Sequence, residues 1–126
     1  REARATLEKT LETAGVTAPV KAEALLRLGD SFAGSGEHAK AVVYFERLYV
    51  AYGKFGELNA KAYWRRGQSL EKLKLEREAL ETYEELAARE DLRRFEEAGL
   101  AGERIAALRE RFPKEAAPSD GKEEPL

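Results

Sequence analysis

Few side chains in this 126-residue sequence could carry out catalysis. His38 is the only histidine, so two imidazoles cannot share a metal ion, and there is no cysteine to supply a thiolate. A nucleophilic triad would have to join His38 to Asp30 and to Ser31 or Ser35. We expect His38 instead to pack against a turn or to face water. The sequence therefore predicts no enzyme, no metal site and no cofactor.

Charge and hydropathy argue against nucleic acid and membranes as direct partners, and the placement of acidic residues argues against acid–base chemistry by paired carboxylates. Lys and Arg number 22 against 24 Asp and Glu, and the basic residues are interleaved with acidic ones rather than collected in a stripe. The Glu-Glu pairs at 84–85 and 96–97 would point about 100° apart on a helix, so neither pair converges for acid–base chemistry. No apolar run approaches the roughly 20 residues that cross a bilayer. We expect no nucleic-acid partner and no membrane insertion.

Helices are the elements that must position these side chains. Gly and Pro separate stretches rich in Ala, Leu, Glu, Lys and Arg, which is a helical composition. Gly15 suits a left-handed helix end. The pairs Glu23–Arg27 and Glu57–Lys61 have the spacing of stabilising i to i+4 ion pairs. The sequence predicts six helices, over about residues 2–14, 17–34, 37–53, 57–73, 76–89 and 92–111.

An internal repeat relates the middle helices. Three pairs of equivalent residues, each 38 positions apart, are Gly29 and Gly67, Ala41 and Ala79, and Phe45 and Tyr83. A glycine inside a helix costs about 1 kcal/mol relative to alanine, so we expect each glycine to mark the close approach of a neighbouring helix. We expect the two aromatic rings to fill the gap that the small residues leave between adjacent helix pairs.

The same register extends to both ends of the chain. Subtracting 38 from positions 41 and 45 gives Ala3 and Leu7, so the first helix has the pattern of the second member of a pair. A shift of 35 carries Gly67 to Gly102, so the last helix has the pattern of a first member and is predicted to act as a terminal cap. The start at Arg1 and the absence of methionine predict a fragment of a larger protein.

The repeated positions resemble the tetratricopeptide repeat. That family places a large residue, Leu-Gly and an aromatic on its first helix, and Ala, an aromatic and a small or apolar residue on its second. The 38-residue period departs from the family's usual period of about 34, and Arg66 departs from the usual leucine. The matching residues are Leu25, Leu28, Gly29, Phe32, Ala41, Phe45 and Leu48 in one repeat and Tyr63, Arg66, Gly67, Leu70, Ala79, Tyr83 and Leu86 in the next.

The resemblance implies an all-α fold, a right-handed α-solenoid of antiparallel helix pairs with about six helices. It divides the chain into a helical repeat domain over 1–112 and a flexible C-terminal tail over 113–126. Within the domain we expect a half repeat at 1–15, repeats at 17–54 and 56–90, and a terminal capping helix at 91–112. The joint around 52–60 looks like that of bacterial cell-envelope members of the family, which implies a periplasmic or envelope location, with the cytoplasm as the alternative.

Trp64 is the residue that the resemblance singles out for partner binding. Tyr63 takes the family's buried bulky position, so Trp64 is turned about 100° toward the concave groove that the first helices of each pair line. Tryptophan is among the residues that concentrate interface energy. The alternative is that Trp64 covers the neighbouring helix pair or a repeat that is missing from this fragment. Its expected groove neighbours are Lys61, Gln68, Glu71 and Lys72, with Glu23, Leu26 and Asp30 from the preceding repeat.

These residues predict a scaffold that binds a protein or peptide segment in the concave groove. The alternative is a purely structural spacer or cap within a longer solenoid of an envelope assembly protein. A helical-repeat RNA binder ranks below both, because no basic stripe follows one face. The first helix should leave the face around Ala3 and Leu7 uncovered, so we expect end-to-end self-association through this helix or fraying of its first turns.

Overall fold

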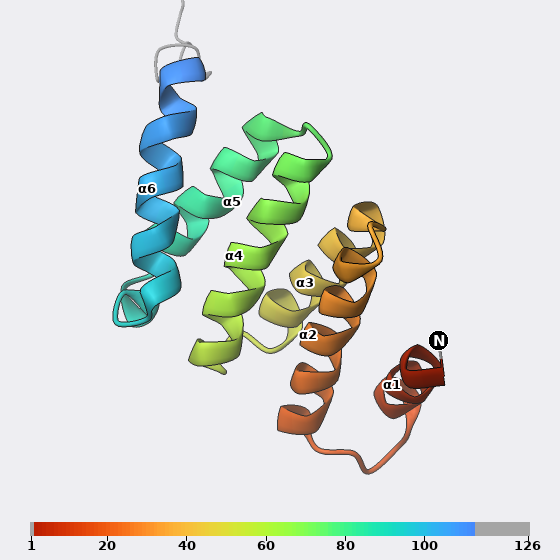
Figure 1. The fold of residues 1–126 in the computed structure, drawn as a ribbon. Coiled ribbons are helices and arrows are strands. Elements are labelled where there is room, and N and C mark those ends of the chain that lie inside the picture. Colours follow the sequence, from red (N-terminus) through yellow and green to blue (C-terminus); the bar gives the residue numbers. More distant parts are fainter. Residues whose placement is uncertain (1, 113–126) are drawn as a thin grey trace, which may run out of the picture.

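Residues 2–112 are described by a computed structural model, and they form six α-helices and one short 3-10 helix, with no strand among them (Figure 1). The tail expected over 113–126 lies outside the described residues. The elements in chain order are α1 (Glu2–Glu12), α2 (Ala18–Gly34), α3 (His38–Ala51), α4 (Gly56–Lys72), α5 (Glu76–Ala88), the 3-10 helix η1 (Glu90–Leu92) and α6 (Glu96–Arg111).

The all-helical fold agrees with the sequence analysis, and the largest difference in helix bounds lies before the last helix. This helix begins at Glu96 rather than near residue 92, because the chain first forms η1 and then an extended residue, Phe95. Leu92 is fully buried, and both Leu92 and Phe95 approach Gly56 at the start of α4. Leu92 comes from the end of η1 and Phe95 from the residue before α6, so this connection itself packs against the start of α4.

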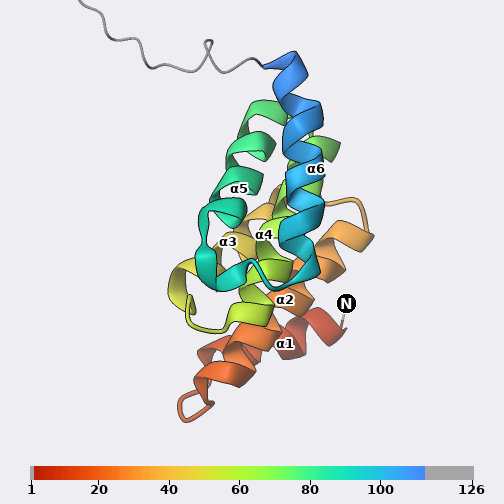
Figure 2. The same ribbon diagram turned by 90° about the vertical axis from the view of Figure 1, so that its left-hand side faces the viewer.

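The helices pack in chain order and form two layers. We call α2, α4 and α6 the A helices and α1, α3 and α5 the B helices. Each helix contacts the next along the chain, and the A helices also contact one another in series. Figures 1 and 2 together show the A helices along one side of the molecule, with α3 and α5 along the other. Stacked rings join the two halves of the core, because Tyr49 of α3 lies 3.7 Å from Tyr63 of α4 between ring centroids.

The repeated glycines accommodate aromatic rings. A Cβ atom on Gly29 would overlap the Phe45 ring, and one on Gly67 would overlap the Tyr83 ring. In each case the ring belongs to the B helix of the pair whose A helix carries the glycine. The expectation that these rings fill gaps between adjacent helix pairs is therefore wrong. Gly102 differs as well, because a Cβ atom there would meet nothing within 4 Å, and this glycine is not a helix contact point.

The joint between α3 and α4, which contains the residues that lengthen the repeat, is fixed by a buried asparagine. Asn59 is fully buried, and its Nδ2 donates hydrogen bonds of 2.9 Å to the carbonyl oxygens of Tyr52 and Phe55. Its Oδ1 accepts a 2.9 Å hydrogen bond from Arg89, which also donates to the carbonyl oxygen of Gly53. The longer turn is therefore an ordered connection that holds α3, α4 and the end of α5 together.

Candidate functional site

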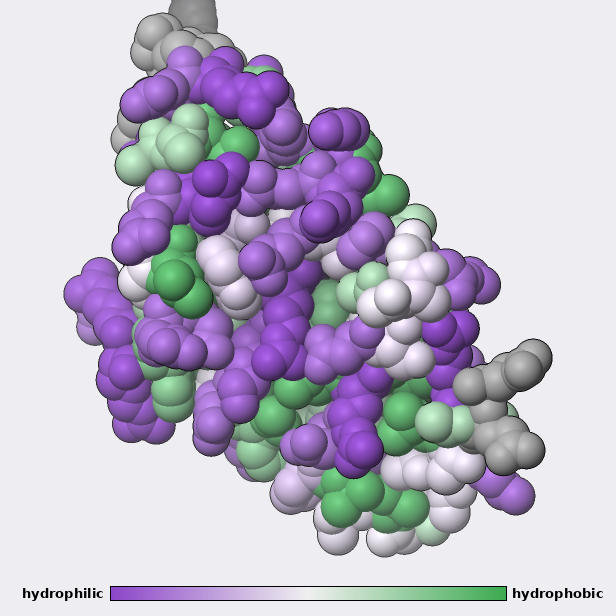
Figure 3. Space-filling view, in the orientation of Figure 1, coloured by the Kyte–Doolittle hydropathy of each residue, from purple (hydrophilic) through white to green (hydrophobic). Residues whose placement is uncertain are grey.

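A pocket of about 330 Å³ opens between the A helices α2 and α4. Its apolar part comes from Ala33 and from the buried ring of Phe45. Figure 3 shows that this side of the molecule is mostly hydrophilic over α4. The polar side chains that line the pocket are Asp30, His38, Arg65, Gln68, Ser69 and Lys72. Three of the residues expected in the groove, at positions 30, 68 and 72, are thus brought together around one opening.

Ion pairs link successive A helices along this side. Arg65 of α4 donates a 2.6 Å hydrogen bond to Asp30 of α2, which ties the first two A helices together across the pocket. Arg104 of α6 forms a two-pronged pair with Glu71 of α4, at 2.7 and 3.0 Å. Bidentate pairs of this kind are stronger and more directional than single contacts. Two of the three acidic residues expected in the groove, Asp30 and Glu71, therefore already have partners within the chain.

Glu71 is the most constrained of the expected groove residues. The Tyr83 hydroxyl, on a fully buried side chain, donates a 2.7 Å hydrogen bond to Glu71 Oε2. Burial by itself raises the pKa of Glu71, but the hydrogen bonds from Arg104 and Tyr83 outweigh this effect and hold the pKa below its usual value. For Tyr83, burial and the neighbouring Glu71 carboxylate both raise the pKa above its usual value. This carboxylate links α4, α5 and α6.

The remaining polar groove residues are more available for contact with a binding partner. Gln68 and Lys72 are exposed, and neither forms a side-chain hydrogen bond or ion pair with any residue in the described range 2–112. Lys61 is half-buried and pairs with Glu57 at 3.2 Å, which confirms the i to i+4 pair expected there. Lys72 is therefore a cation at the rim of the pocket with no acidic partner among the residues that the structure describes.

Trp64 is half-buried rather than open to the groove. Its ring packs against the buried Tyr83 ring of α5, with centroids 5.4 Å apart and planes tilted by 41°. It also borders the apolar cluster formed by α4, α5 and α6. Part of the ring therefore belongs to the core of its own helix pair, and the rest lies one helical turn from Gln68.

Leu26 is not a groove residue. It is only 6% exposed and belongs to the apolar cluster between α2 and α3. It occupies the same register as Trp64, but its shorter aliphatic side chain is almost fully covered by its neighbours. Glu23 is exposed at the other end of α2, but it forms no ion pair with Arg27 among the described residues, so the expected i to i+4 pair is absent there.

Comparison with known families identifies the repeats. A tetratricopeptide repeat model matches residues 23–54 and 61–94, which is more than half of the chain, and the two matches are 38 residues apart. The chain belongs to the tetratricopeptide repeat family. No curated protein and no solved structure matches it. Tetratricopeptide repeats in general suggest a protein-interaction scaffold, whereas the bacterial-envelope type inferred from the joint at 52–60 stays a prediction.

Two residues of the second repeat break a pattern: Arg66 departs from the family's usual leucine, and Lys74 departs from the preceding repeat. Arg66, in place of the usual leucine, reaches the B-helix side of the stack, donates a hydrogen bond to the buried Thr82 hydroxyl and pairs with Glu46 at 3.7 Å. Lys74, a non-glycine residue, has a positive φ of 66°, at the place that Gly36 occupies one repeat earlier. In the first case a polar contact between α4 and α5 takes over the role of an apolar one.

Sequence reasoning missed three polar residues of the pocket, which are His38, Arg65 and Ser69. His38 was expected to pack against a turn or face water, but it starts α3 and its Nδ1 lies 3.0 Å from Ser69 Oγ of α4. Arg65 was overlooked because an exposed arginine on a helix has no distinctive spacing. The usable signal is that position 65 is 38 residues after Arg27, so both A helices carry arginine at the same place.

Between residues 2 and 112, no three His, Cys, Asp or Glu side chains gather in an arrangement suited to a metal ion. No helix in this range combines the length and apolar character needed to cross a membrane. The candidate site is accordingly the A-helix pocket and its rim.

Proposed function

We propose that this tetratricopeptide repeat protein binds a segment of another protein along its A helices, with an acidic side chain of the partner in the pocket between α2 and α4. The observation that carries the proposal is the unpaired Lys72 at the rim, beside the exposed Gln68 and above the apolar surface of Ala33 and Phe45. A carboxylate entering there would gain a cation and an amide donor.

The surroundings of the pocket support a peptide rather than a reactive small molecule as ligand. The histidine at its edge is engaged with Ser69, and Asp30 is held by Arg65, so nucleophile, base and acid do not converge on one point. The exposed part of Trp64 lies one turn along α4 and would extend the contact surface. We propose that the protein acts as a scaffold and catalyses no reaction.

A direct test selects peptides from a random display library on the immobilised chain and measures the best binder by calorimetry. Lys72→Glu should weaken binding about tenfold or more, because it places like charges together in the pocket. Lys54→Glu, with the same charge change in the exposed α3–α4 turn, is the matched control and should leave the affinity unchanged. Binding that is equal in both variants would place the partner elsewhere on the molecule.

A structural role within a longer stack is the second candidate function. The observation that favours it is that Asp30–Arg65 and Glu71–Arg104 use groove charges to hold successive A helices together, and that Trp64 packs on Tyr83. On this account the segment spaces or caps other repeats of an envelope assembly protein. A library that yields no binder sensitive to Lys72→Glu would favour it.

A further inference from the structure

A second surface, at the N-terminal end of the stack, is open. A groove of about 350 Å³ lies between α1 and α2, and its walls are mainly apolar. Val20 is 50% exposed there. Figure 3 shows hydrophobic side chains gathered over the start of α2 beside α1. The lining residues are Leu7, Thr10, Pro19, Val20, Glu23, Ala24 and Arg27.

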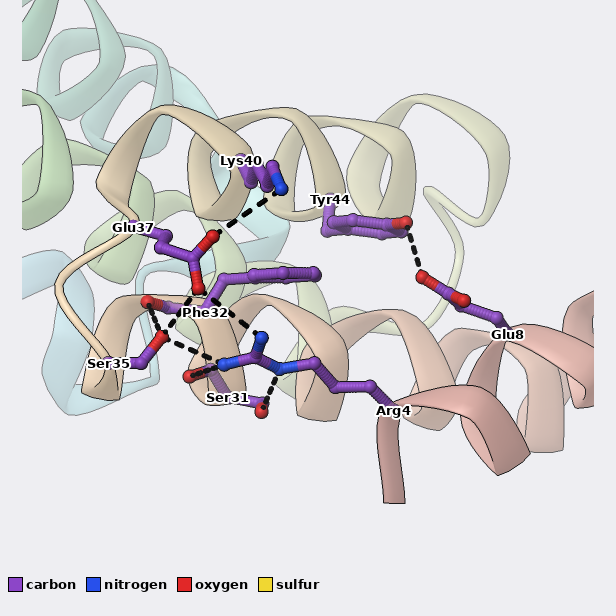
Figure 4. Close-up of polar contacts among 8 residues, drawn as sticks. All are labelled: Arg4, Glu8, Ser31, Phe32, Ser35, Glu37, Lys40 and Tyr44. Carbon is purple, nitrogen blue, oxygen red and sulfur yellow. Dashed lines mark hydrogen bonds and ion pairs between the residues drawn. The ribbon is translucent and has the colours of Figure 1, made fainter. Parts of the chain in front are cut away.

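The groove has a defined shape because α1 is fastened to the next helix pair (Figure 4). Arg4 donates hydrogen bonds of 2.8 Å to the hydroxyls of Ser31 and Ser35. Its guanidinium also lies 4.1 Å from the centroid of the Phe32 ring, and it pairs with Glu37 at 3.3 Å. These contacts hold the first turns of α1, the part of the helix that was expected to fray.

Repeat register indicates what kind of helix would fill the groove. Leu7 of α1 stands 38 residues before Phe45 and 76 before Tyr83. Each of those rings lies on the glycine of an A helix, Gly29 or Gly67. Leu7 is only half-buried and faces the open groove. By this register, the helix that fits against Leu7 is an A-type helix with a glycine at the contact.

The chain carries such a helix at its other end. On α6, Cβ atoms on Gly99 and Gly102 would meet nothing within 4 Å among residues 2–112, so these residues leave open the surface on which a B helix would lie. Positions 12 and 16 after Gly102, where the other pairs have alanine and an aromatic, are occupied by Lys114 and Pro118. The alanine and the aromatic residue of the repeat pattern are therefore not found at these two sequence positions.

Charge complementarity connects the two ends. Asp30 of α2 pairs with Arg65 of α4 at 2.6 Å. In repeat register, Arg27 corresponds to Arg65, and Glu103, which follows Gly102 as Asp30 follows Gly29, corresponds to Asp30. Both are exposed, and neither has an ion-pair partner among the described residues. Arg27 lines the groove and Glu103 adjoins the open glycine of α6.

We infer that α6 of one copy of this chain docks in the α1–α2 groove of a second copy and lies against α1 as α2 lies against α3 and α4 against α5. Leu7 then packs on Gly102 of the partner copy, and Arg27 pairs with its Glu103, as Arg65 pairs with Asp30 within the chain. The two surfaces differ, so the contact is heterologous and repeats head to tail, with assemblies that lengthen as concentration rises.

Sedimentation velocity of the 126-residue chain over a concentration series tests this inference. The wild-type chain should show a weight-average mass that rises with concentration and falls with added salt. Arg27→Glu alone, and Glu103→Arg alone, should each weaken association about tenfold or more, because each brings like charges together. Lys54→Glu is the matched control and should associate like the wild type. Circular dichroism confirms that every variant remains folded.

The decisive arm mixes the two charge-reversed variants. One carries glutamate at both positions and the other arginine at both, so every contact between unlike copies joins opposite charges. Association should return in the equimolar mixture to near the wild-type strength. A wild-type chain that stays monomeric at every concentration would overturn the inference. So would variants that associate normally on their own, or a mixture that remains as weak as its components.

Discussion

The Glu71 carboxylate accepts hydrogen bonds from Arg104 of α6 and from the buried Tyr83 hydroxyl of α5, while its own backbone belongs to α4. Tyr83 in turn packs against Trp64 and lies over Gly67. One aromatic side chain thus joins a polar network to the glycine contact of its helix pair. At the scale of residues, the network of Glu71, Tyr83 and Arg104 links α4, α5 and α6.

Replacing the carboxylate should destabilise the protein. Glu71→Ala leaves the Tyr83 hydroxyl buried without an acceptor and removes the bidentate partner of Arg104, which should cost about 2 kcal/mol of unfolding free energy. Urea denaturation at pH 7 measures this loss. Lys72→Ala, at the next position but exposed and unpaired, should change the free energy by less than about 0.5 kcal/mol.

The same variant tests the pKa of Glu71. The pKa is lower in the folded than in the unfolded protein, so ionised Glu71 contributes stability above the unfolded-state pKa, and this contribution is lost as pH falls through the folded-state pKa. The difference in unfolding free energy between wild type and Glu71→Ala should therefore shrink between pH 7 and pH values below about 4. A difference that stays constant over this range would contradict the lowered pKa.

Two glycines at equivalent positions should respond oppositely to alanine. In Gly67→Ala the new Cβ overlaps the Tyr83 ring, which is buried and tied to Glu71, so we expect a loss of about 1 to 3 kcal/mol. In Gly102→Ala the new Cβ meets nothing, and the better helix propensity should add up to about 1 kcal/mol. Thermal melting of dilute samples compares them; equal melting temperatures would show that ring contact does not explain the repeated glycine.

At the scale of elements, the turns that join an A helix to the B helix after it share one backbone hydrogen-bonding pattern. One of these turns contains a strained residue. After α2, Gly36 adopts a positive φ and the Glu37 amide donates to the Phe32 carbonyl oxygen at 2.8 Å. After α4, Lys74 takes the same conformation and the Leu75 amide donates to Leu70 at 2.9 Å. Glycine adopts this backbone region at no steric cost, whereas other L-residues pay about 1 kcal/mol.

Lys74→Gly should therefore stabilise the protein by about 0.5 to 1 kcal/mol, since the relief of strain exceeds the added flexibility of the unfolded chain. Chemical denaturation of the variant measures the gain. Lys74→Ala is the control that removes the charge and keeps the strain, and it should leave the stability near that of the wild type. A gain of the same size in both would assign the effect to charge instead.

The helices and their order were predictable because glycine, alanine and aromatic residues recur at fixed spacing. Contacts between side chains far apart in sequence were not. Nothing in the spacing of Glu71 and Arg104 shows that they meet, since that depends on how α4 and α6 cross. The burial of Leu26 and the open surface at Gly102 have the same origin: a pattern shows which face a residue occupies but not whether a neighbouring helix covers it.

At the scale of the whole molecule, the A helices form one continuous side on which the pocket, Lys72 and the exposed part of Trp64 follow one another along α4. A segment bound along this helix would pass all three. Because Trp64 is the only tryptophan, all tryptophan fluorescence of the chain comes from this one position on α4. Substituting Trp64 itself would also disturb Tyr83, so the native side chain is the better probe.

The most direct measurement of the central claim is therefore a titration of Trp64 fluorescence with a selected, tryptophan-free peptide that carries an acidic residue. The account predicts a saturable change in emission whose midpoint matches the calorimetric Kd, shifts about tenfold in Lys72→Glu and is unchanged in Lys54→Glu. Calorimetric binding without any change in Trp64 emission, and with equal affinity in both variants, would contradict the claim that the A helices hold the partner.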